Sequence, residues 1–398
     1  MKGKVPMHRV LLAPDSFKGT MRADEICEIW KEVIIKYDPK ADIHCMPMAD
    51  GGEGLTEAYL RALGGERIPV MVTGPLEQKV DTFYGCLPDG RAVIEMAAAA
   101  GLPLAGARND PMTATTFGVG EMLMDAARRG IKQVLLGLGG SATNDGGIGM
   151  AAALGYQFYD ELGNLLQPLA KNLGRVFHVR RPDHLPALQV VSACDVNNPL
   201  CGADGATYTF GQQKGVTEEQ LPVLDAALAN FACVLHKDLH VDVLEIPGAG
   251  AAGGLGAAVI AFLGGRLKPG IELMLDAYGF DALLNGSDWV FTGEGRIDGQ
   301  STRGKVPSGV GLRCKAAGVP CIALCGSIGE GAERIYDCGI TAYFSAVSGP
   351  MDLASIRQTC RADMRRLMDA VMRLLLHEER KRCVCLKQFV NETVARRT

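Results

Sequence analysis

The chain has 398 residues, a formal net charge of −4 at pH 7, 47% hydrophobic residues and 22% charged residues. This charge balance leaves no broad basic surface for nucleic acid, and no uninterrupted apolar run reaches the roughly 18 residues that span a membrane. The first 16 residues contain Lys and Arg but no apolar segment long enough for a signal peptide, so we expect a cytoplasmic protein. The length predicts two or three domains, at roughly 150 residues each.

Glycine is the residue type in excess. The chain has 50 glycines, about twice the usual share of roughly 7%. They cluster in short loops beside apolar segments instead of forming a low-complexity linker. Such loops can bring backbone N–H groups close to a ligand.

The first part of the chain predicts strands and helices in alternation. Residues 8–16 form a buried strand and a loop, residues 21–37 have apolar side chains at helical spacing, residues 41–54 predict a strand and a glycine loop, and residues 55–63 a helix. This order is typical of a parallel sheet.

The alternation of predicted strands and helices stops at about residue 67. Three strands are predicted in succession, at 67–75, 79–88 and 91–97. Alternation then resumes, with helices expected at 115–130, 148–156, 217–239, 257–265 and 271–285, and strands at 131–140, 188–196, 287–293, 319–326 and 341–347.

Because the two ends share one pattern and the middle differs, we predict an α/β protein with two lobes. A Rossmann-like lobe with a parallel sheet is expected from residues 1–70 and 286–398, and an inserted α/β lobe with a mixed sheet from 71–285. Ligands of such folds bind at the carboxyl ends of strands and in clefts between lobes, which places the expected active site between the two lobes.

Five polar, glycine-rich loops each follow a predicted strand. Their polar residues and glycines are Asp15, Ser16 and Lys18; Asp50, Gly51, Gly52 and Glu53; Gly139, Gly140, Ser141, Thr143, Asn144 and Asp145; Asp195, Asn197, Asn198, Gln212 and Lys214; and Glu294, Arg296, Asp298 and Lys305. An acidic residue beside glycine in one loop is usually a turn or a helix cap. Five such loops favour phosphoryl transfer, which needs oxygen ligands for Mg²⁺ and donors and cations for the phosphoryl oxygens.

The fifth loop contains Gly299, Gly304 and Lys305 at the spacing of a nucleotide phosphate loop, but Val306 replaces the Ser or Thr that would ligate Mg²⁺. The pattern is therefore a broken phosphate loop, an accident of spacing, or part of a different phosphate site that holds its metal another way.

Two glycine patterns favour an alternative, a nicotinamide-dependent oxidoreductase of a small hydroxy acid. GLGGSA (137–142) is followed by TNDGG, so we expect its helix to begin only near Ile148, too late to hold a pyrophosphate. GAGAAG (248–253) follows a weak strand ended by Pro247, and its glycines are expected to permit close packing. A third reading is a non-catalytic sugar-acid sensor on the same scaffold.

Taken together, the loops closely resemble the type I glycerate kinase family over roughly residues 8–375. The resemblance rests on APDSFKG, PMADGGEG, VTGPL, IEMAAAAGL, GLGGSATNDGG, ACDVNNPLCG, FGQQKG, PGAGAAGGLGAA and TGEGRIDGQSTRGK, in this order. It implies a cytosolic two-lobed α/β enzyme that transfers the γ-phosphoryl group of ATP to D-glycerate with Mg²⁺, commonly giving 2-phosphoglycerate. The family usually has H-G-K-A-P where this chain has Arg303 to Pro307, so Lys305 is retained and a histidine at position 303 is not.

The resemblance and the residue types together suggest roles. We expect Asp195 or Asp298 as the base, Lys18 and Lys305 on the transferred phosphoryl group, and Asp50 and Glu294 as Mg²⁺ ligands. The expected nucleotide contacts are Asp15, Ser16, Gly51, Gly52, Gly139, Gly140, Ser141, Asn144 and Asp145, and the expected glycerate contacts are Arg296, Asn198 and Gln212. The choice between 2- and 3-phosphoglycerate and the oligomeric state stay open.

Overall fold

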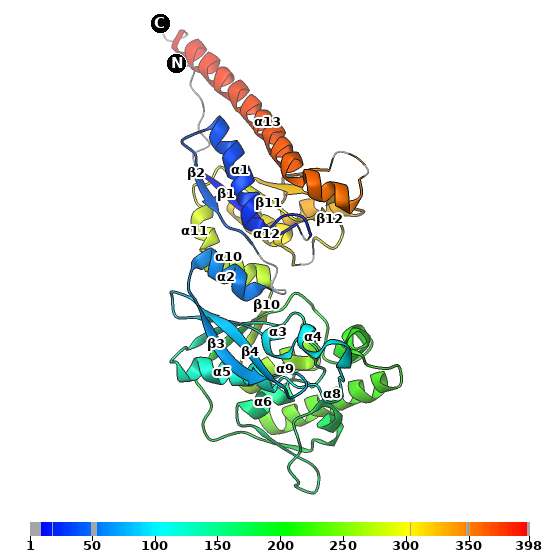
Figure 1. Ribbon diagram of the computed structural model, residues 1–398. Helices are drawn as coiled ribbons and strands as arrows, with labels where there is room; N and C mark the ends of the chain where they lie inside the picture. Colours follow the sequence, from blue (N-terminus) through cyan, green and yellow to red (C-terminus); the bar gives the residue numbers. More distant parts are fainter. Residues whose placement is uncertain are drawn as a thin grey trace. The chain divides into compact units, whose positions relative to one another are not determined.

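The chain divides into two compact units in the computed structural model, one formed by residues 1–49 with 274–398 and the other by residues 50–273. The structure describes residues 9–17, 19–48, 54–302, 304–347, 349 and 351–395, without the side chains of 353 and 377–395. Figure 1 shows that the first unit combines the blue start of the chain with its yellow to red end. The predicted α/β class, with a parallel sheet built from both ends and a mixed sheet in the middle, is confirmed.

The division between the units falls at residue 50 and at residue 274, earlier than the predicted 71 and 286. Residues 66–73 belong to the second unit because they pair along their whole length with 79–86. Asp276 and Asp281 belong to the first unit, where both carboxylates contact the guanidinium of Arg313.

The first unit contains a five-stranded parallel sheet in the order β15-β13-β11-β1-β2. Its strands are β1 (Arg9–Pro14), β2 (Asp42–Cys45), β11 (Trp289–Gly293), β13 (Cys321–Cys325) and β15 (Ala342–Ser345), and β12 (Arg296–Ile297) pairs separately with β14 (Ser327–Ile328). Its helices are α1 (Ala23–Tyr37), α11 (Phe280–Leu284), α12 (Val306–Ala317) and α13 (Leu353–Ala395).

Alternate residues of the strands of the first unit face different helices, as expected for strands buried on both faces. Val10 and Leu12 of β1 pack in one core with buried residues of α1 and α13. Figure 1 shows α1 beside the start of α13. The helix α12 packs against β1, β11 and β13 and buries Val306 and Val310.

The order of the strands creates a topological switch point between β1 and β11. From β1 the chain continues outward to β2 on one side, whereas β11, β13 and β15 follow one another outward on the other side. Loops leave a parallel sheet in opposite directions at such a point, and ligands bind there, outside the carboxyl ends of the strands. The residues that follow β1 and β11 are therefore placed to form a site.

The second unit contains a six-stranded mixed sheet in the order β10-β9-β6-β5-β4-β3. Its strands are β3 (Glu66–Thr73), β4 (Lys79–Cys86), β5 (Ala92–Glu95), β6 (Gln133–Gly137), β9 (Gln189–Ala193) and β10 (Arg266–Lys268); β7 (Gln157–Tyr159) and β8 (His178–Arg180) form a separate pair. β5, β6, β9 and β10 are parallel, so their carboxyl ends share one edge.

The second unit also contains helices, most of which bury residues in one large apolar core against this sheet. They are α2 (Leu55–Leu63), α3 (Ala97–Ala100), α4 (Leu102–Ala105), α5 (Phe117–Arg128), α6 (Ile148–Ala153), α7 (Ala206–Phe210), α8 (Gln220–Leu239) and α9 (Ala251–Leu263); α10 (Gly270–Tyr278) crosses from this unit into the first. The helix predicted at 271–285 is divided at Gly279, which has a left-handed backbone, and α6 begins at Ile148 as predicted.

Glycines let the start of α9 lie directly on the loop before α6. Ala252, Gly253 and Gly254 have left-handed backbone angles, and the Gly146 N–H donates to the Gly253 carbonyl at 2.9 Å. A Cβ atom on Gly253 would lie 2.1 Å from the Thr143 carbonyl oxygen. The expectation that GAGAAG serves close packing is confirmed.

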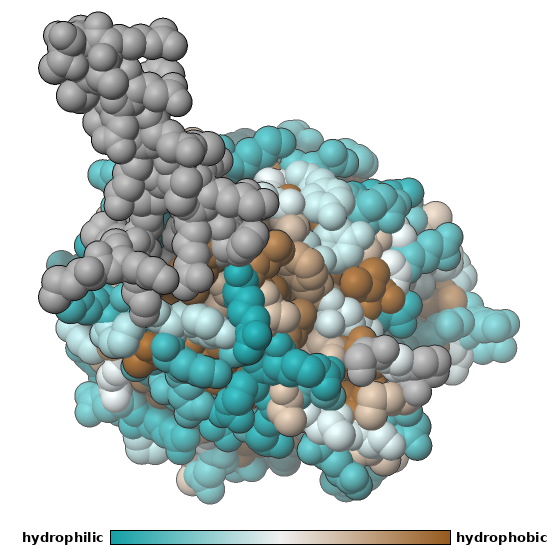
Figure 2. Space-filling model, turned by 90° about the horizontal axis from the view of Figure 1, so that it is seen from above, coloured by the Kyte–Doolittle hydropathy of each residue, from teal (hydrophilic) through white to brown (hydrophobic). Residues whose placement is uncertain are grey.

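Within the described part of the chain, no helix is long and apolar enough to cross a membrane. Figure 2 shows hydrophilic residues over much of the visible face, with smaller apolar areas between them.

A substitution pair tests the contact between α9 and the loop before α6. Gly264→Ala adds a Cβ in open space at a left-handed position and should cost about 1–2 kcal/mol of stability from backbone strain. Gly253→Ala has the same kind of backbone plus the clash with Thr143, and should cost about 1–3 kcal/mol more. Urea unfolding of both variants measures the difference, and equal losses would contradict the packing described.

Candidate functional site

Two acidic side chains lie at the switch point of the first unit. The paired residues Pro14 and Gly293 end β1 and β11, and Asp15 and Glu294 follow them directly. The Asp15 N–H donates to the Gly293 carbonyl at 2.8 Å, which holds the two strand ends in register. Asp15 is 7% exposed and Glu294 is 6% exposed, an unusual degree of burial for carboxylates.

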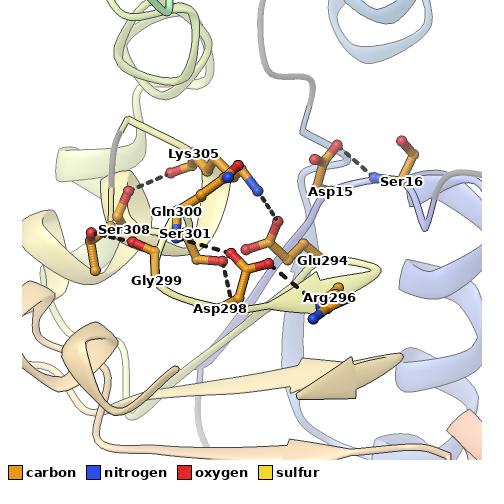
Figure 3. Close-up of polar contacts among 11 residues, drawn as sticks. Asp15, Ser16, Glu294, Arg296, Asp298, Gly299, Gln300, Ser301, Lys305 and Ser308 are labelled. Atoms are coloured by element: carbon orange, nitrogen blue, oxygen red, sulfur yellow. Dashed lines mark hydrogen bonds and ion pairs between the residues drawn. The ribbon is translucent and has the colours of Figure 1, made fainter. Parts of the chain in front are cut away.

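Glu294 is a buried carboxylate with unused acceptor capacity. Its Oε1 atom has no hydrogen-bond partner among the described residues, and its Oε2 atom lies 3.5 Å from the Lys305 ammonium nitrogen (Figure 3). Burial raises the pKa of Glu294, and the hydroxyl of Ser301 and the charge of Lys305 offset this only in part. A buried oxygen without a partner is costly, so this atom is well suited to receive a cation or a donor from a ligand.

Asp298 is used within its own loop. Its Oδ1 accepts from the Gln300 N–H at 2.9 Å, its own N–H donates to Ser301 Oγ at 3.0 Å, and its Oδ2 lies 3.5 Å from Arg296 Nε. Figure 3 shows these groups on one turn, beside Glu294. Asp298 therefore shapes the turn that leads to Lys305.

Lys305 stands at the start of α12, where its side chain reaches Glu294 and its carbonyl accepts from Ser308 Oγ at 2.8 Å. Val306 is fully buried in the core under the helix. This position holds a core residue, so the resemblance to a nucleotide phosphate loop does not extend to a metal-ligating hydroxyl.

The second unit has a cavity of about 220 Å³ at the carboxyl edge of β6 and β9. The loop Gly139–Ser141, which follows β6, forms part of its wall, and Asp195, which follows β9, forms another part. Gln213 and Lys214 complete the polar lining, and the rest is apolar. The cavity thus combines glycine backbone, a carboxylate and a lysine.

Asp195 presents an exposed carboxylate to this cavity. Its Oδ1 accepts from the Gly270 N–H, which follows β10, at 2.8 Å. The contact fixes the side chain between the ends of two neighbouring strands, so Asp195 is oriented before any ligand binds.

Asp145 and Asn144, by contrast, are completely buried. Asp145 accepts from the N–H and hydroxyl of Thr116 at 2.9 and 2.8 Å, and from the N–H groups of Gly147 and Gly149 at 3.0 and 3.3 Å. Burial raises its pKa, and these four donors oppose the rise. Both residues hold the loop behind the cavity, and neither is exposed to a ligand.

Lys214 belongs to the fourth polar loop, but the sequence predicts no catalytic or binding role for it. It is 2% exposed and belongs to the short 3-10 helix Gln212–Lys214. Burial lowers the pKa of Lys214 to about 7, although the charge of Asp145 acts in the opposite direction. Its neighbour Gln212 is exposed and is absent from the cavity lining, where Gln213 stands instead. The sequence spacing did not distinguish these three residues, because their directions depend on the turn of a 3-10 helix.

Of the other predicted residues, the structure describes Asn198 and Ser16 but not the remaining four. Asn198 donates through Nδ2 to the Asp204 carbonyl at 2.7 Å and to Thr209 Oγ1 at 3.2 Å, so it ties its own loop. Ser16 donates its N–H to Asp15 Oδ1 at 2.6 Å. The predictions for Lys18, Asp50, Gly51 and Gly52 lie outside the described residues.

The two dinucleotide-like patterns do not form dinucleotide sites. The helix after GLGGSA begins only at Ile148, so its N-terminus is not next to those glycines. In GAGAAG, Cβ atoms on Gly250 and Gly253 would meet backbone oxygens at 2.2 and 2.1 Å. The glycines of GAGAAG pack backbone against backbone, whereas Gly139 and Gly140 of GLGGSA line the cavity.

A buried carboxylate beside Lys305 at a switch point, and a cavity lined by glycines and a carboxylate, are typical of α/β enzymes that bind small anionic substrates. A sequence model of the glycerate kinase family matches residues 10–376, and the chain belongs to this family. It is therefore a kinase, which excludes the oxidoreductase and sensor alternatives.

Individual relatives agree with this assignment. The chain is 44% identical over 360 residues to glycerate kinase of Halalkalibacterium halodurans, covering 88% of this chain and 94% of the relative. It is 41% identical over 364 residues to glycerate 2-kinase of Escherichia coli K12, covering 89% and 96%. A crystal structure described as glycerate kinase 2 from Salmonella typhimurium LT2 matches with a TM-score of 0.83 and 39% identity, covering 94% of this chain and 99% of that one.

The burial of Glu294 makes a prediction about stability. Its folded-state pKa is raised, so the folded protein holds this proton more tightly than the unfolded chain, and stability is lost as the pH rises through the folded-state pKa. The free energy of unfolding of Glu294→Gln, relative to that of the unsubstituted protein, should therefore be higher at pH 8 than at pH 4. Urea unfolding at both pH values measures this gain. The same measurement on Glu218→Gln, at an exposed glutamate, should show no trend; a flat difference for Glu294→Gln would contradict the prediction.

Proposed function

We propose that this protein transfers the γ-phosphoryl group of ATP to a hydroxyl of D-glycerate, with Mg²⁺, and forms 2-phosphoglycerate. The observation that carries the proposal is Glu294, a buried carboxylate with an unpartnered oxygen beside Lys305 at the switch point. Glycerate as the acceptor is supported by relatives named glycerate kinase, and the 2-position by the relative named glycerate 2-kinase.

The acidic residues fit a magnesium ion. Mg²⁺ in kinases is bound by one or two carboxylates, water and substrate phosphates, so it needs no all-protein cage. The part of the chain that the structure describes contains no group of three or more His, Cys, Asp or Glu placed to hold a metal. Glu294 has an acceptor oxygen to offer, and we infer that Glu294 and Asp50 would hold the ion. When bound, Mg²⁺ neutralises charge on the phosphate oxygens.

Asp195 is proposed as the base. A hydroxyl of glycerate attacks the γ-phosphorus, its proton passes to the Asp195 carboxylate, and the bond to the β–γ bridging oxygen breaks with its electron pair leaving on ADP. Asp195 is exposed and lines the cavity, whereas Asp298 is not part of the cavity lining and shapes its own turn. This difference ranks Asp195 first among the two candidates.

The lysines and glycine loops are proposed to bind phosphate. Lys305 and Lys18 would offset negative charge on the transferred group, and the backbone N–H groups of Gly139–Gly140 and Gly51–Gly52 would donate to phosphate oxygens. Asp15 and Ser16 stand beside Glu294 at the same sheet edge, and we propose that they contact the nucleotide. That both units act on the same pair of substrates stays a prediction.

The activity itself is testable directly. ADP formation should require D-glycerate and Mg²⁺ together, and phosphorus NMR of the product should show a phosphate on the 2-hydroxyl. A product carrying the phosphate on the 3-hydroxyl would overturn the regiochemistry alone. Absence of ADP formation with D-glycerate would overturn the proposed function.

The choice of base is tested by a pair of variants. Asp195→Asn should lower kcat by roughly 10²–10⁴, the usual contribution of general base catalysis, at saturating ATP and glycerate. Asp298→Asn should change kcat less than about tenfold, because Asp298 holds a turn. The reverse ranking would move the role of base to Asp298.

A further inference from the structure

Lys214 is a buried lysine that the proposed reaction does not use. It is 2% exposed, yet it belongs to the wall of the cavity in the second unit. Burying an ammonium group is costly unless it is paired and hydrogen-bonded. A cation at such a position therefore needs a physical reason.

The surrounding protein holds Lys214 in place but does not neutralise it fully. Its Nζ donates to the Thr143 carbonyl at 2.8 Å, and its own carbonyl accepts from Asn109 Nδ2 at 2.8 Å. An ammonium group has three N–H donors, and within the described residues only this one hydrogen bond from Nζ is formed. The other two N–H donors of Nζ form no hydrogen bond within the described residues.

Asp145 is the acidic neighbour, and it is already engaged. Its carboxylate takes four hydrogen bonds from Thr116, Gly147 and Gly149. Its charge does not compensate for the burial of Lys214, whose pKa falls to about 7. A ligand anion placed against Lys214 would supply the missing charge.

The rest of the cavity suggests which anion. Its volume of about 220 Å³ suits a three-carbon acid better than a whole nucleotide. Asp195, the proposed base, lines the same cavity, so the acceptor hydroxyl must come there. A small acid with its hydroxyl toward Asp195 has its carboxylate left to bind a cation.

We propose that Lys214 binds the carboxylate of the acceptor and selects hydroxy acids over uncharged alcohols. This inference rests on the proposed function. In this proposal Lys214 takes the place of Arg296 as the cation that binds the carboxylate, because the side chain of Arg296 is 64% exposed and lies beside Asp298.

The experiment compares D-glycerate with its uncharged methyl ester as acceptors. Lys214→Met should lower the preference for glycerate, measured as the ratio of kcat/KM values, by about tenfold to a hundredfold, the range for a hydrogen bond to a charged group. The KM for ATP should change less than about threefold. Lys214→Arg, which keeps the charge, should retain most of the preference.

Asn109→Ala is the matched control for a merely structural effect. Asn109 ties the same two segments, through hydrogen bonds from Nδ2 to the carbonyls of Ala142 and Lys214 at 2.9 and 2.8 Å. The Asn109→Ala substitution should lower the free energy of unfolding and change the preference for glycerate by less than about threefold.

If Lys214→Met does not fold, Lys214→Gln is used instead, because it retains an N–H donor for the Thr143 carbonyl.

The outcomes separate this inference from the proposed function. If the unsubstituted protein forms no ADP with glycerate, the proposed function fails and the inference fails with it. If the unsubstituted protein phosphorylates glycerate and Lys214→Met, or Lys214→Gln in its place, keeps the full preference for glycerate over the methyl ester, only the inference is overturned. An equal loss in Asn109→Ala would also overturn it, because the effect would then be structural.

Discussion

The parallel pairing of β1 with β11 is the constraint on which the first unit depends. It joins strands that are far apart in the chain, Arg9–Pro14 and Trp289–Gly293, and it creates the switch point. Asp15 and Glu294 meet there because the pairing ends both strands at the same level. Without this pairing, the buried carboxylate and Lys305 would have no shared position at the sheet edge.

Close backbone contact has a comparable role in the second unit. The left-handed turn at Ala252–Gly254 lies on the loop before α6, with glycines wherever a side chain would clash. The same loop carries the buried Asp145, which accepts hydrogen bonds from Thr116 and from Gly147 and Gly149 of its own segment. These contacts hold the loop behind the cavity in place. A fixed loop suits a small substrate, for which orientation is a large part of catalysis.

The two candidate sites differ in how well their residues could be predicted. The sequence predicts roles for Glu294 and Lys305 because their loop follows an evident apolar strand and contains residue types suited to phosphate and metal. The sequence analysis names Gln212 as a glycerate contact, whereas Gln213 and Lys214, for which it predicts no role, line the cavity. These residues are adjacent in sequence, and only the 3-10 helix and the packing of Thr143 over Lys214 give them different surroundings.

The sequence by itself determined the α/β class, most of the strands and helices in their order, and the glycerate kinase family, because apolar periodicity and loop motifs are local properties of the chain. Tertiary structure alone decided the limits of the two units, since residues 66–73 are assigned by their pairing with β4. It also decided which polar groups are buried, which are already bonded and which remain available. Burial and hydrogen bonding depend on distant segments, as the unpartnered oxygen of Glu294 and the buried ammonium of Lys214 show.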